Sequence, residues 1–260
     1  MIYAPIGRRG QGKSTLGRFI ASCNDARVII DPKFDMQNPN AALVARVNDI
    51  SPAIAELARA DRRFDEIVIQ PRHMRAAFIE TTAALERWRE QDRFARWTLV
   101  LDEWKVIQDS LRDKIADLEH LGRLVRMTTV ERQHIVITCH RPVDLHPNVR
   151  SLIDHWLLFR VTEARDVKVI AELSTRAALR ARRVSSRVYV HLDARRNEST
   201  DAGDENPVTC DYGASWHVCL RCGHKPRQAR PGCRCGCHGA APQLPARQLE
   251  IGPIPAHIDT

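Results

Sequence analysis

The sequence has few aromatic residues and no long apolar segment. Phe, Trp and Tyr make up 5% of its 260 residues, and no apolar run approaches the roughly 20 residues of a membrane-spanning helix. The first residues resemble a strand and lack the basic stretch, apolar run and cleavage site of a secretory signal. We therefore expect a soluble, intracellular protein without a membrane span. The 43% of apolar residues favours one globular domain with an appendage and excludes a fibre or a chain that is disordered throughout.

Charge is distributed unevenly along the chain. Lys and Arg number 40 against 32 Asp and Glu, which gives a net charge of +8. Residues 201–260 contain six residues of each sign, so the positive surplus lies in residues 1–200. A basic surface favours a polyanion such as nucleic acid, although charge alone does not identify the ligand.

Short apolar runs alternate with segments of helical periodicity, which is the order of a parallel sheet covered by helices. The expected strands are Ile2–Ile6, Val28–Asp31, Glu66–Gln70, Thr98–Asp102, Ile135–Thr138, His155–Phe159 and Arg187–Leu192. The expected helices are Lys13–Cys23, Ala41–Val47, Ile54–Arg59, Met74–Arg93, Leu111–Met127 and Ala164–Leu173. The sequence thus predicts an α/β fold with a mostly parallel sheet flanked by helices.

The composition changes after Asp193. The next residues are polar and charged, and beyond them Gly, Pro, Cys and His dominate with almost no apolar periodicity. We therefore expect three parts: an α/β domain over residues 1–197, a Cys- and His-rich module over 198–239, and a proline-containing tail over 240–260. The tail is expected to be extended or disordered.

The most specific motif lies between the first expected strand and the first expected helix. Residues 7–14 match the pattern G-x-x-x-x-G-K-[ST], and the expected nucleotide-binding segment extends to the next residue: Gly7, Arg8, Arg9, Gly10, Gln11, Gly12, Lys13, Ser14 and Thr15. Glycines allow such a loop to wrap around phosphates, and the helix that follows directs its positive dipole end at them. Lys13 is expected to contact the β- and γ-phosphates of ATP, and Ser14 to bind Mg²⁺.

A second element supports the phosphate loop. The apolar strand that ends at Leu101 is followed by Asp102 and Glu103. Strand ends meet at one edge of a parallel sheet, so Asp102 can reach the loop's Mg²⁺ while Glu103 faces the γ-phosphate and activates water as the catalytic base. The alternative is a solvated acidic pair at the start of a helix, which the helix dipole would favour equally.

Four motifs in order carry a resemblance to a known family. They are the phosphate loop, Ile29–Lys33, Leu99–Glu103 and Ile135–Pro142. Together they resemble the FtsK/HerA superfamily of P-loop ATPases, which includes viral genome-packaging ATPases. The resemblance covers roughly residues 1–195. It implies a RecA/FtsK-like fold and an ATP-hydrolysing translocase of double-stranded DNA that acts as a homo-oligomeric ring.

The resemblance assigns further candidate residues. The family usually has Gln before the Arg-Pro element, where it senses the γ-phosphate, and this sequence has His140. An imidazole also donates or accepts a hydrogen bond, so His140 is expected to act as the sensor; the alternative is a buried structural histidine. Ring ATPases of this family supply an arginine to the nucleotide of the next subunit. Arg126 and Arg132 are the candidates, and the sequence does not choose between them; the favoured alternative for either one is a surface or DNA-facing arginine. Arg8 and Arg9 either bind nucleotide or lie at a subunit contact.

Basic clusters offer contacts for the phosphate backbone that a translocase must bind and release. The arginines in or near them are Arg72, Arg75, Arg176, Arg180, Arg182 and Arg183. A solvated helix face explains any one of them equally well. Whether the nucleic acid is DNA or RNA stays open on charge alone.

The C-terminal cysteines have the spacing of a zinc site. A C-x₂-C pair precedes a second cluster by about ten residues, and the candidate Zn²⁺ ligands are Cys219, Cys222, Cys233, Cys235, Cys237 and His238. Two close pairs of soft ligands suit tetrahedral zinc in a small structural module. The second cluster has more donors than one ion needs, so its exact ligands stay open. An unstructured, reactive tail is the alternative.

Two classes of function follow from these features. The favoured one is a viral genome-packaging ATPase, cytoplasmic or virion-associated, that binds double-stranded DNA and has a capsid or portal-vertex protein as a further partner. The alternative is a P-loop switch or assembly protein that binds DNA or a partner through the zinc module. ATP turnover stimulated by DNA distinguishes them, because only a motor requires that coupling.

Overall fold

The fold was analysed in a computed structural model. The structure describes residues 1–22, 24–34, 38–92, 94–111, 114–127, 132–184, 188–194 and 208–211. All of them belong to one compact unit, Met1–Ala214, and the second unit, Ser215–Thr260, lies outside the described residues. The expected zinc ligands fall in that second unit.

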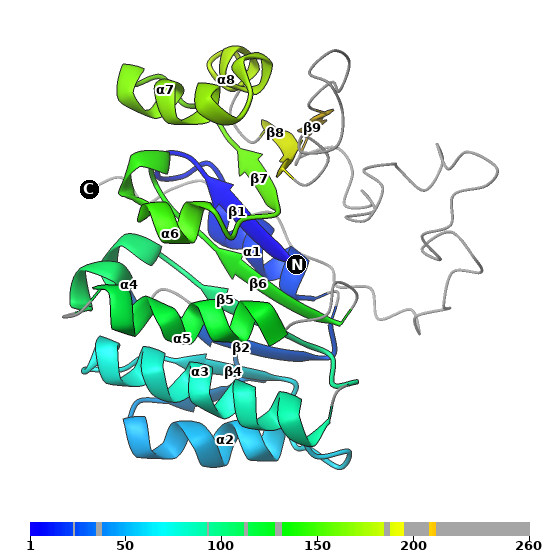
Figure 1. Cartoon of the computed structure of the whole chain (residues 1–260). Helices are drawn as coiled ribbons and strands as arrows, with labels where there is room; N and C mark the ends of the chain where they lie inside the picture. Colours follow the sequence, from blue (N-terminus) through cyan, green and yellow to red (C-terminus); the bar gives the residue numbers. More distant parts are fainter. Residues whose placement is uncertain are drawn as a thin grey trace, which may run out of the picture. The chain divides into compact units, whose positions relative to one another are not determined.

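The described strands form one sheet in the order β3-β4-β2-β5-β6-β1-β7-β8-β9 (Figure 1). The strands are β1 (Ile2–Ile6), β2 (Ala26–Ile30), β3 (Ala42–Val44), β4 (Glu66–Ile69), β5 (Trp97–Leu101), β6 (Gln133–Ile137), β7 (His155–Leu158), β8 (Val188–Asp193) and β9 (Val208–Asp211). The sheet is parallel from β3 to β7, and β8 and β9 are antiparallel to their neighbours. This confirms the predicted α/β fold with a mostly parallel sheet.

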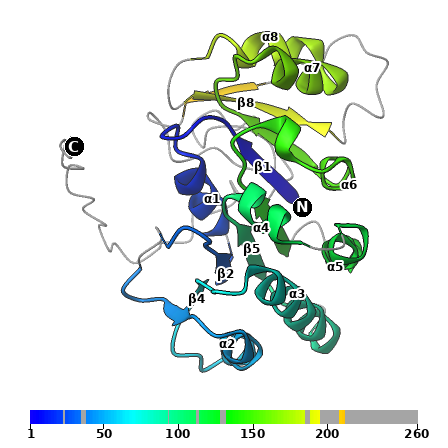
Figure 2. The same ribbon diagram turned by 90° about the vertical axis from the view of Figure 1, so that its left-hand side faces the viewer.

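Helices cover both faces of the sheet. They are α1 (Lys13–Ala21), α2 (Ile50–Leu57), α3 (Met74–Gln91), α4 (Trp104–Ser110), α5 (Lys114–Met127), α6 (Pro147–Arg150), α7 (Ala164–Leu173) and α8 (Thr175–Ala181), with short 3₁₀ helices η1 (Val47–Asp49) and η2 (Pro142–Asp144). Helix α1 lies on one face of the sheet, and α3, α4 and α5 lie on the other (Figure 2). None of the described helices combines the length and apolar composition that crossing a membrane requires.

One predicted helix is wrong, and three short helices were not predicted. Residues 41–47 contain strand β3, which pairs with β4 at the sheet edge, instead of a helix. Leu43 is exposed and Val44 is buried, which is the alternation of a strand. Pairing with β4 therefore overrides a local pattern of Ala, Leu and Val that also suits a helix. Helices α4, α6 and α8 were missed because their four to seven residues span barely one or two turns, too short for periodicity to show.

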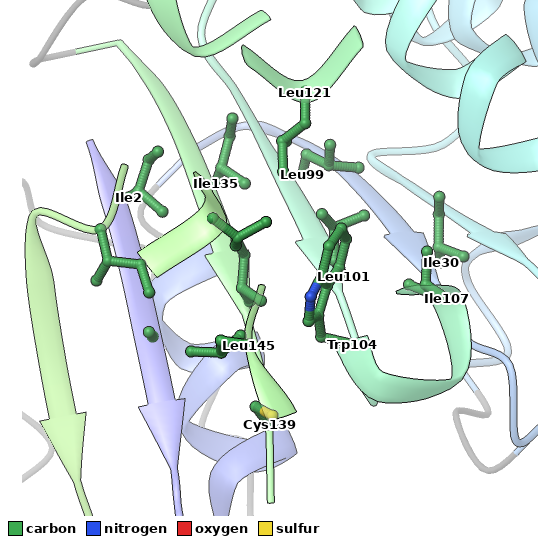
Figure 3. Close-up of a cluster of buried hydrophobic side chains, with 14 of the residues drawn as sticks. Ile2, Ile30, Leu99, Leu101, Trp104, Ile107, Leu121, Ile135, Cys139 and Leu145 are labelled. Atoms are coloured by element: carbon green, nitrogen blue, oxygen red, sulfur yellow. The ribbon is translucent and has the colours of Figure 1, made fainter. Parts of the chain in front are cut away.

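The core lies between β5 and the helices on one face of the sheet. Leu99 and Leu101 of β5 are fully buried, and so are Leu121 of α5 and Trp104 of α4 (Figure 3). Central strands of a parallel sheet are covered on both faces, which explains their nearly continuous apolar sequence. This packing fixes the carboxyl end of β5, where the acidic pair follows.

Candidate nucleotide-binding site

The glycine-rich segment forms a loop between β1 and α1. Gly10 has φ 78° and Gly12 has φ 94°, both in the left-handed region that favours glycine. Gly7 has a different reason to be glycine, since a Cβ there would lie 2.5 Å from Cβ of Phe159. The side chain of Gln11 closes the loop, because its Oε1 accepts a hydrogen bond from the Arg8 amide at 2.7 Å. The sequence places Thr15 on the first turn of α1, where it is exposed.

Lys13 is buried at the start of α1, beside a backbone carbonyl and an imidazole ring. Its Nζ donates to the backbone oxygen of Arg8 at 3.0 Å and lies 3.3 Å from Nδ1 of His140. Burial lowers the pKa of Lys13, and the nearby carboxylates of Glu103 and Asp102 oppose that shift. The nearby carboxylates offset the effect of burial on this ammonium group only in part. Such a group in a glycine-rich loop is well suited to bind phosphate oxygens.

Asp102 joins the phosphate loop to two strands. Its Oδ1 accepts hydrogen bonds from Ser14 Oγ at 3.0 Å and from Thr138 Oγ1 at 2.6 Å. Burial raises the pKa of Asp102, whereas these two hydrogen bonds act in the opposite direction. A hydroxyl and a carboxylate are the hard oxygen ligands that Mg²⁺ prefers. The two residues that the sequence assigned to Mg²⁺ are therefore adjacent and chemically suited to it.

Glu103 is held in an unusual backbone conformation beside them. Its φ of 48° lies in the left-handed region, which costs about 1 to 3 kcal/mol for a residue with a side chain. The surrounding structure fixes it, since the Glu103 amide donates to Thr138 Oγ1 and the Trp104 amide to the Thr138 carbonyl, both at 2.9 Å. The backbone conformation of Glu103 therefore helps to set the direction of its carboxylate at the end of β5.

Both carboxylate oxygens of Glu103 have partners. Oε1 lies 2.7 Å from Lys33 Nζ, and Oε2 lies 2.9 Å from Nε2 of His140. His140 therefore bridges Lys13 and Glu103. The structure brings the candidate lysine, base and sensor into one connected cluster.

Sequence reasoning gave Lys33 no role of its own. The residue appeared only as part of a family motif after the second strand. In the structure β2 lies next to β5, so the residues that follow these two strands meet at the same edge. Asp31 orients the turn, because its Oδ1 accepts a hydrogen bond from the Lys33 amide at 3.1 Å. The signal in the sequence is a cation directly after an apolar strand, whereas the position of that strand beside the acidic one comes from the structure.

Arg126 and Arg132 are not part of this cluster. Arg126 lies near the end of α5, is exposed and forms an ion pair with Glu119. Arg132 precedes β6, where its guanidinium group lies 4.8 Å from the ring centroid of Phe94. Both are at the amino ends of the strands, whereas the phosphate loop is at the carboxyl ends. Neither contacts the phosphate loop of its own chain, and action on a neighbouring subunit stays a prediction.

The remaining candidates are peripheral or outside the described residues. Arg8 and Arg9 are exposed on the loop, and Arg8 donates a hydrogen bond to Thr162. The zinc ligands Cys219, Cys222, Cys233, Cys235, Cys237 and His238 are not among the described residues. Within the described ranges, no group of three or more His, Cys, Asp and Glu side chains could hold a metal ion. The zinc site stays a prediction.

Comparison with known proteins identifies the fold. Neither a protein-family model nor a curated protein sequence matches the chain. Solved structures do: the DNA-packaging ATPase B204 from Sulfolobus turreted icosahedral virus aligns with a TM-score of 0.56 and 18% identity, over 75% of this chain and 93% of that one. This is the P-loop NTPase fold.

Two further structures agree with this assignment. The genome packaging NTPase B204 from Sulfolobus turreted icosahedral virus 2, solved with ATPγS, has a TM-score of 0.55 and 15% identity, over 75% of this chain and 93% of its own. VirB4 of Thermoanaerobacter pseudethanolicus has a TM-score of 0.52 and 11% identity, over 74% and 86%. The predicted resemblance to viral packaging ATPases is confirmed for the fold of this P-loop NTPase. At these identities the likeness concerns the fold alone.

Proposed function

We propose that this protein is an ATPase that moves double-stranded DNA, with viral genome packaging as its setting. The observation that carries the proposal is the connected cluster at the carboxyl ends of β1, β5 and β6. It combines a buried lysine in a glycine-rich loop, a Ser–Asp pair suited to Mg²⁺ and a glutamate bonded to two basic side chains. The structural likeness to packaging NTPases is consistent with it.

The residues divide the chemistry between them. Lys13 and the loop amides bind the β- and γ-phosphates, and Ser14 and Asp102 hold Mg²⁺. When bound, the ion neutralises charge on the phosphate oxygens. Glu103 accepts a proton from the attacking water. The oxygen of that water bonds to phosphorus while the bond from phosphorus to the leaving ADP oxygen breaks. The products are ADP and phosphate.

Lys33 and His140 act on Glu103 in this scheme. At 2.7 and 2.9 Å from its oxygens, they orient the carboxylate, and one of its remaining lone pairs accepts the proton. His140 also contacts Lys13. A γ-phosphate that binds Lys13 therefore competes with His140 for that lysine. Because His140 also contacts Glu103, this competition links phosphate binding to the base, which is the chemistry of a phosphate sensor.

The proposal includes a ring and a nucleic acid. The net charge of +8 supports a polyanionic partner. In a ring, Arg126 or Arg132 would leave its present partner, Glu119 or Phe94, to complete the site of a neighbouring subunit. In that arrangement the arginine stabilises the negative charge of the transition state.

Steady-state ATP turnover with and without duplex DNA tests the proposal. The wild type should hydrolyse ATP faster when duplex DNA is present. Glu103→Gln should still bind a fluorescent ATP analogue but lose about 100-fold or more of its turnover, because the amide accepts no proton. Full turnover in this variant would remove Glu103 from the mechanism. A wild-type turnover rate that does not change when duplex DNA is added would favour a P-loop switch.

A further inference from the structure

A basic cleft lies at the same sheet edge as the phosphate loop but several strands away. Its volume is about 580 Å³, and Ala45, Arg46, Val47, Asn48, Arg72 and His73 line it. These residues follow the carboxyl ends of β3 and β4. Because β1 and β4 are separated by β6, β5 and β2, the cleft lies roughly 19 Å from the phosphate loop, at about 4.8 Å per strand. It is therefore distinct from the nucleotide site.

The two arginines of the cleft differ from most arginines around them. Arg46 and Arg72 are exposed and form no ion pair with any described residue. In the same stretch of the sequence, Arg59, Arg63 and Arg87 pair with carboxylates. Arg75, which the sequence also indicated as a nucleic-acid contact, is bound through two 2.8 Å hydrogen bonds to Asp117. The charge of the cleft is thus available to a ligand, whereas that of Arg75 is already compensated.

The lining indicates which kind of anion fits. Two of the six residues that line the cleft are arginines, and a histidine lies beside them. An open cleft with two exposed guanidinium groups suits phosphates presented on a polymer backbone, which are contacted without base recognition. The first turn of α3 starts at the cleft and contains no acidic residue, so nothing in that turn repels an anion.

We propose that the cleft formed by Arg46, Arg72 and His73 binds backbone phosphates of duplex DNA. The inference deepens the proposed function and rests on it, because it assigns the DNA contact to a defined surface. It also separates that contact from the nucleotide site.

Hydrogen bonds connect the cleft to the catalytic base. Between its walls, the Gln70 amide donates to the Val44 carbonyl at 2.9 Å. Gln70 Nε2 donates to Asp31 Oδ2 at 3.0 Å, and the other oxygen of Asp31 accepts from the Lys33 amide. Lys33 in turn contacts Glu103. This chain of contacts joins the strands that carry the cleft to the side chain that holds the proposed base, and it offers a route by which nucleotide and DNA binding can be coupled.

The salt dependence of DNA binding tests the proposal. The full-length protein is titrated with a fluorescent duplex of about 30 base pairs at several salt concentrations, as wild type and as Arg46→Gln with Arg72→Gln. Each lost phosphate contact should reduce the slope of log K against log salt by about 0.9. We expect a reduction of about 1.8 for the double variant, with affinity at least about tenfold weaker near 0.1 M salt.

A matched variant controls for net charge. Arg165→Gln with Lys168→Gln removes two exposed cations from α7, at the other end of the sheet. This control should change the slope by less than about 0.5. Melting temperatures of both double variants verify folding. Equal slopes for the two double variants, or a wild type that does not bind the duplex, would overturn the assignment. The proposed ATPase activity is judged separately, by the turnover of Glu103→Gln without DNA.

Discussion

The two edges of the parallel sheet use polar residues differently. At the amino edge, side chains fasten neighbouring strands: Asn24 Nδ2 donates to the Trp97 and Arg132 carbonyls at 2.8 and 3.0 Å, and Gln133 Nε2 donates to the Ala95 carbonyl at 2.6 Å. At the carboxyl edge, the side chains of Lys13, His140, Glu103 and Lys33 contact one another. Asn24 and Gln133 thus fasten strands to one another, whereas the partners in the carboxyl-edge cluster are mainly other side chains, which a ligand can replace. We infer that the amino-edge bonds serve stability and the carboxyl-edge cluster the proposed activity.

The largest effect should come from Lys13→Met. The change removes the cation from the phosphate loop, and we expect ATP turnover to fall about 1,000-fold or more, equivalent to roughly 4 kcal/mol of transition-state stabilisation. Burial lowers the pKa of Lys13, which means that the fold disfavours its charge. The variant should therefore melt at or above the wild-type temperature. A large drop in melting temperature would show that Lys13 is needed for the fold and would weaken the contrast between the edges.

The opposite outcome is expected at the amino edge for Asn24→Ala. The side chain is 2% exposed, and its loss leaves buried acceptors on Trp97, Thr98 and Arg132 without their donor. We expect the free energy of unfolding to fall by about 2 to 3 kcal/mol in urea denaturation. Turnover per folded molecule should be unchanged.

Ser22→Ala provides the control for that measurement. Its hydroxyl donates to the Phe19 carbonyl at 2.7 Å on the exposed surface of the same turn. This substitution should cost less than about 0.5 kcal/mol. An equal loss in the two variants would mean that Asn24 has no special structural role.

The smallest effect should follow from His140→Gln. In the present contacts Nδ1 of the ring faces Lys13 and Nε2 faces Glu103. A glutamine amide has one acceptor and one donor group and can make both contacts. We expect turnover within about threefold of wild type, measured beside His140→Ala, which should lose at least about tenfold. A wild-type rate of ATP turnover in His140→Ala would show that His140 has no part in the proposed reaction.

The sequence predicted the parts of this site that are encoded locally. The phosphate loop follows from fixed spacings between Gly7 and Ser14, and the position of Asp102 and Glu103 follows from an apolar strand that ends there. The contact between Lys33 and Glu103 could not be predicted in the same way, because it depends on β2 and β5 being neighbours. Strand β3 and the basic cleft also depend on pairing at the sheet edge, which residues 41–47 do not specify on their own.

The backbone of Glu103 has a consequence for the working cycle. Its left-handed conformation is held by hydrogen bonds from the Glu103 and Trp104 amides to Thr138, so the fold itself sets the direction of the carboxylate. A carboxylate fixed in this way by main-chain hydrogen bonds would keep a single direction through successive rounds of the proposed reaction, and the strain at one residue is the cost of that constancy.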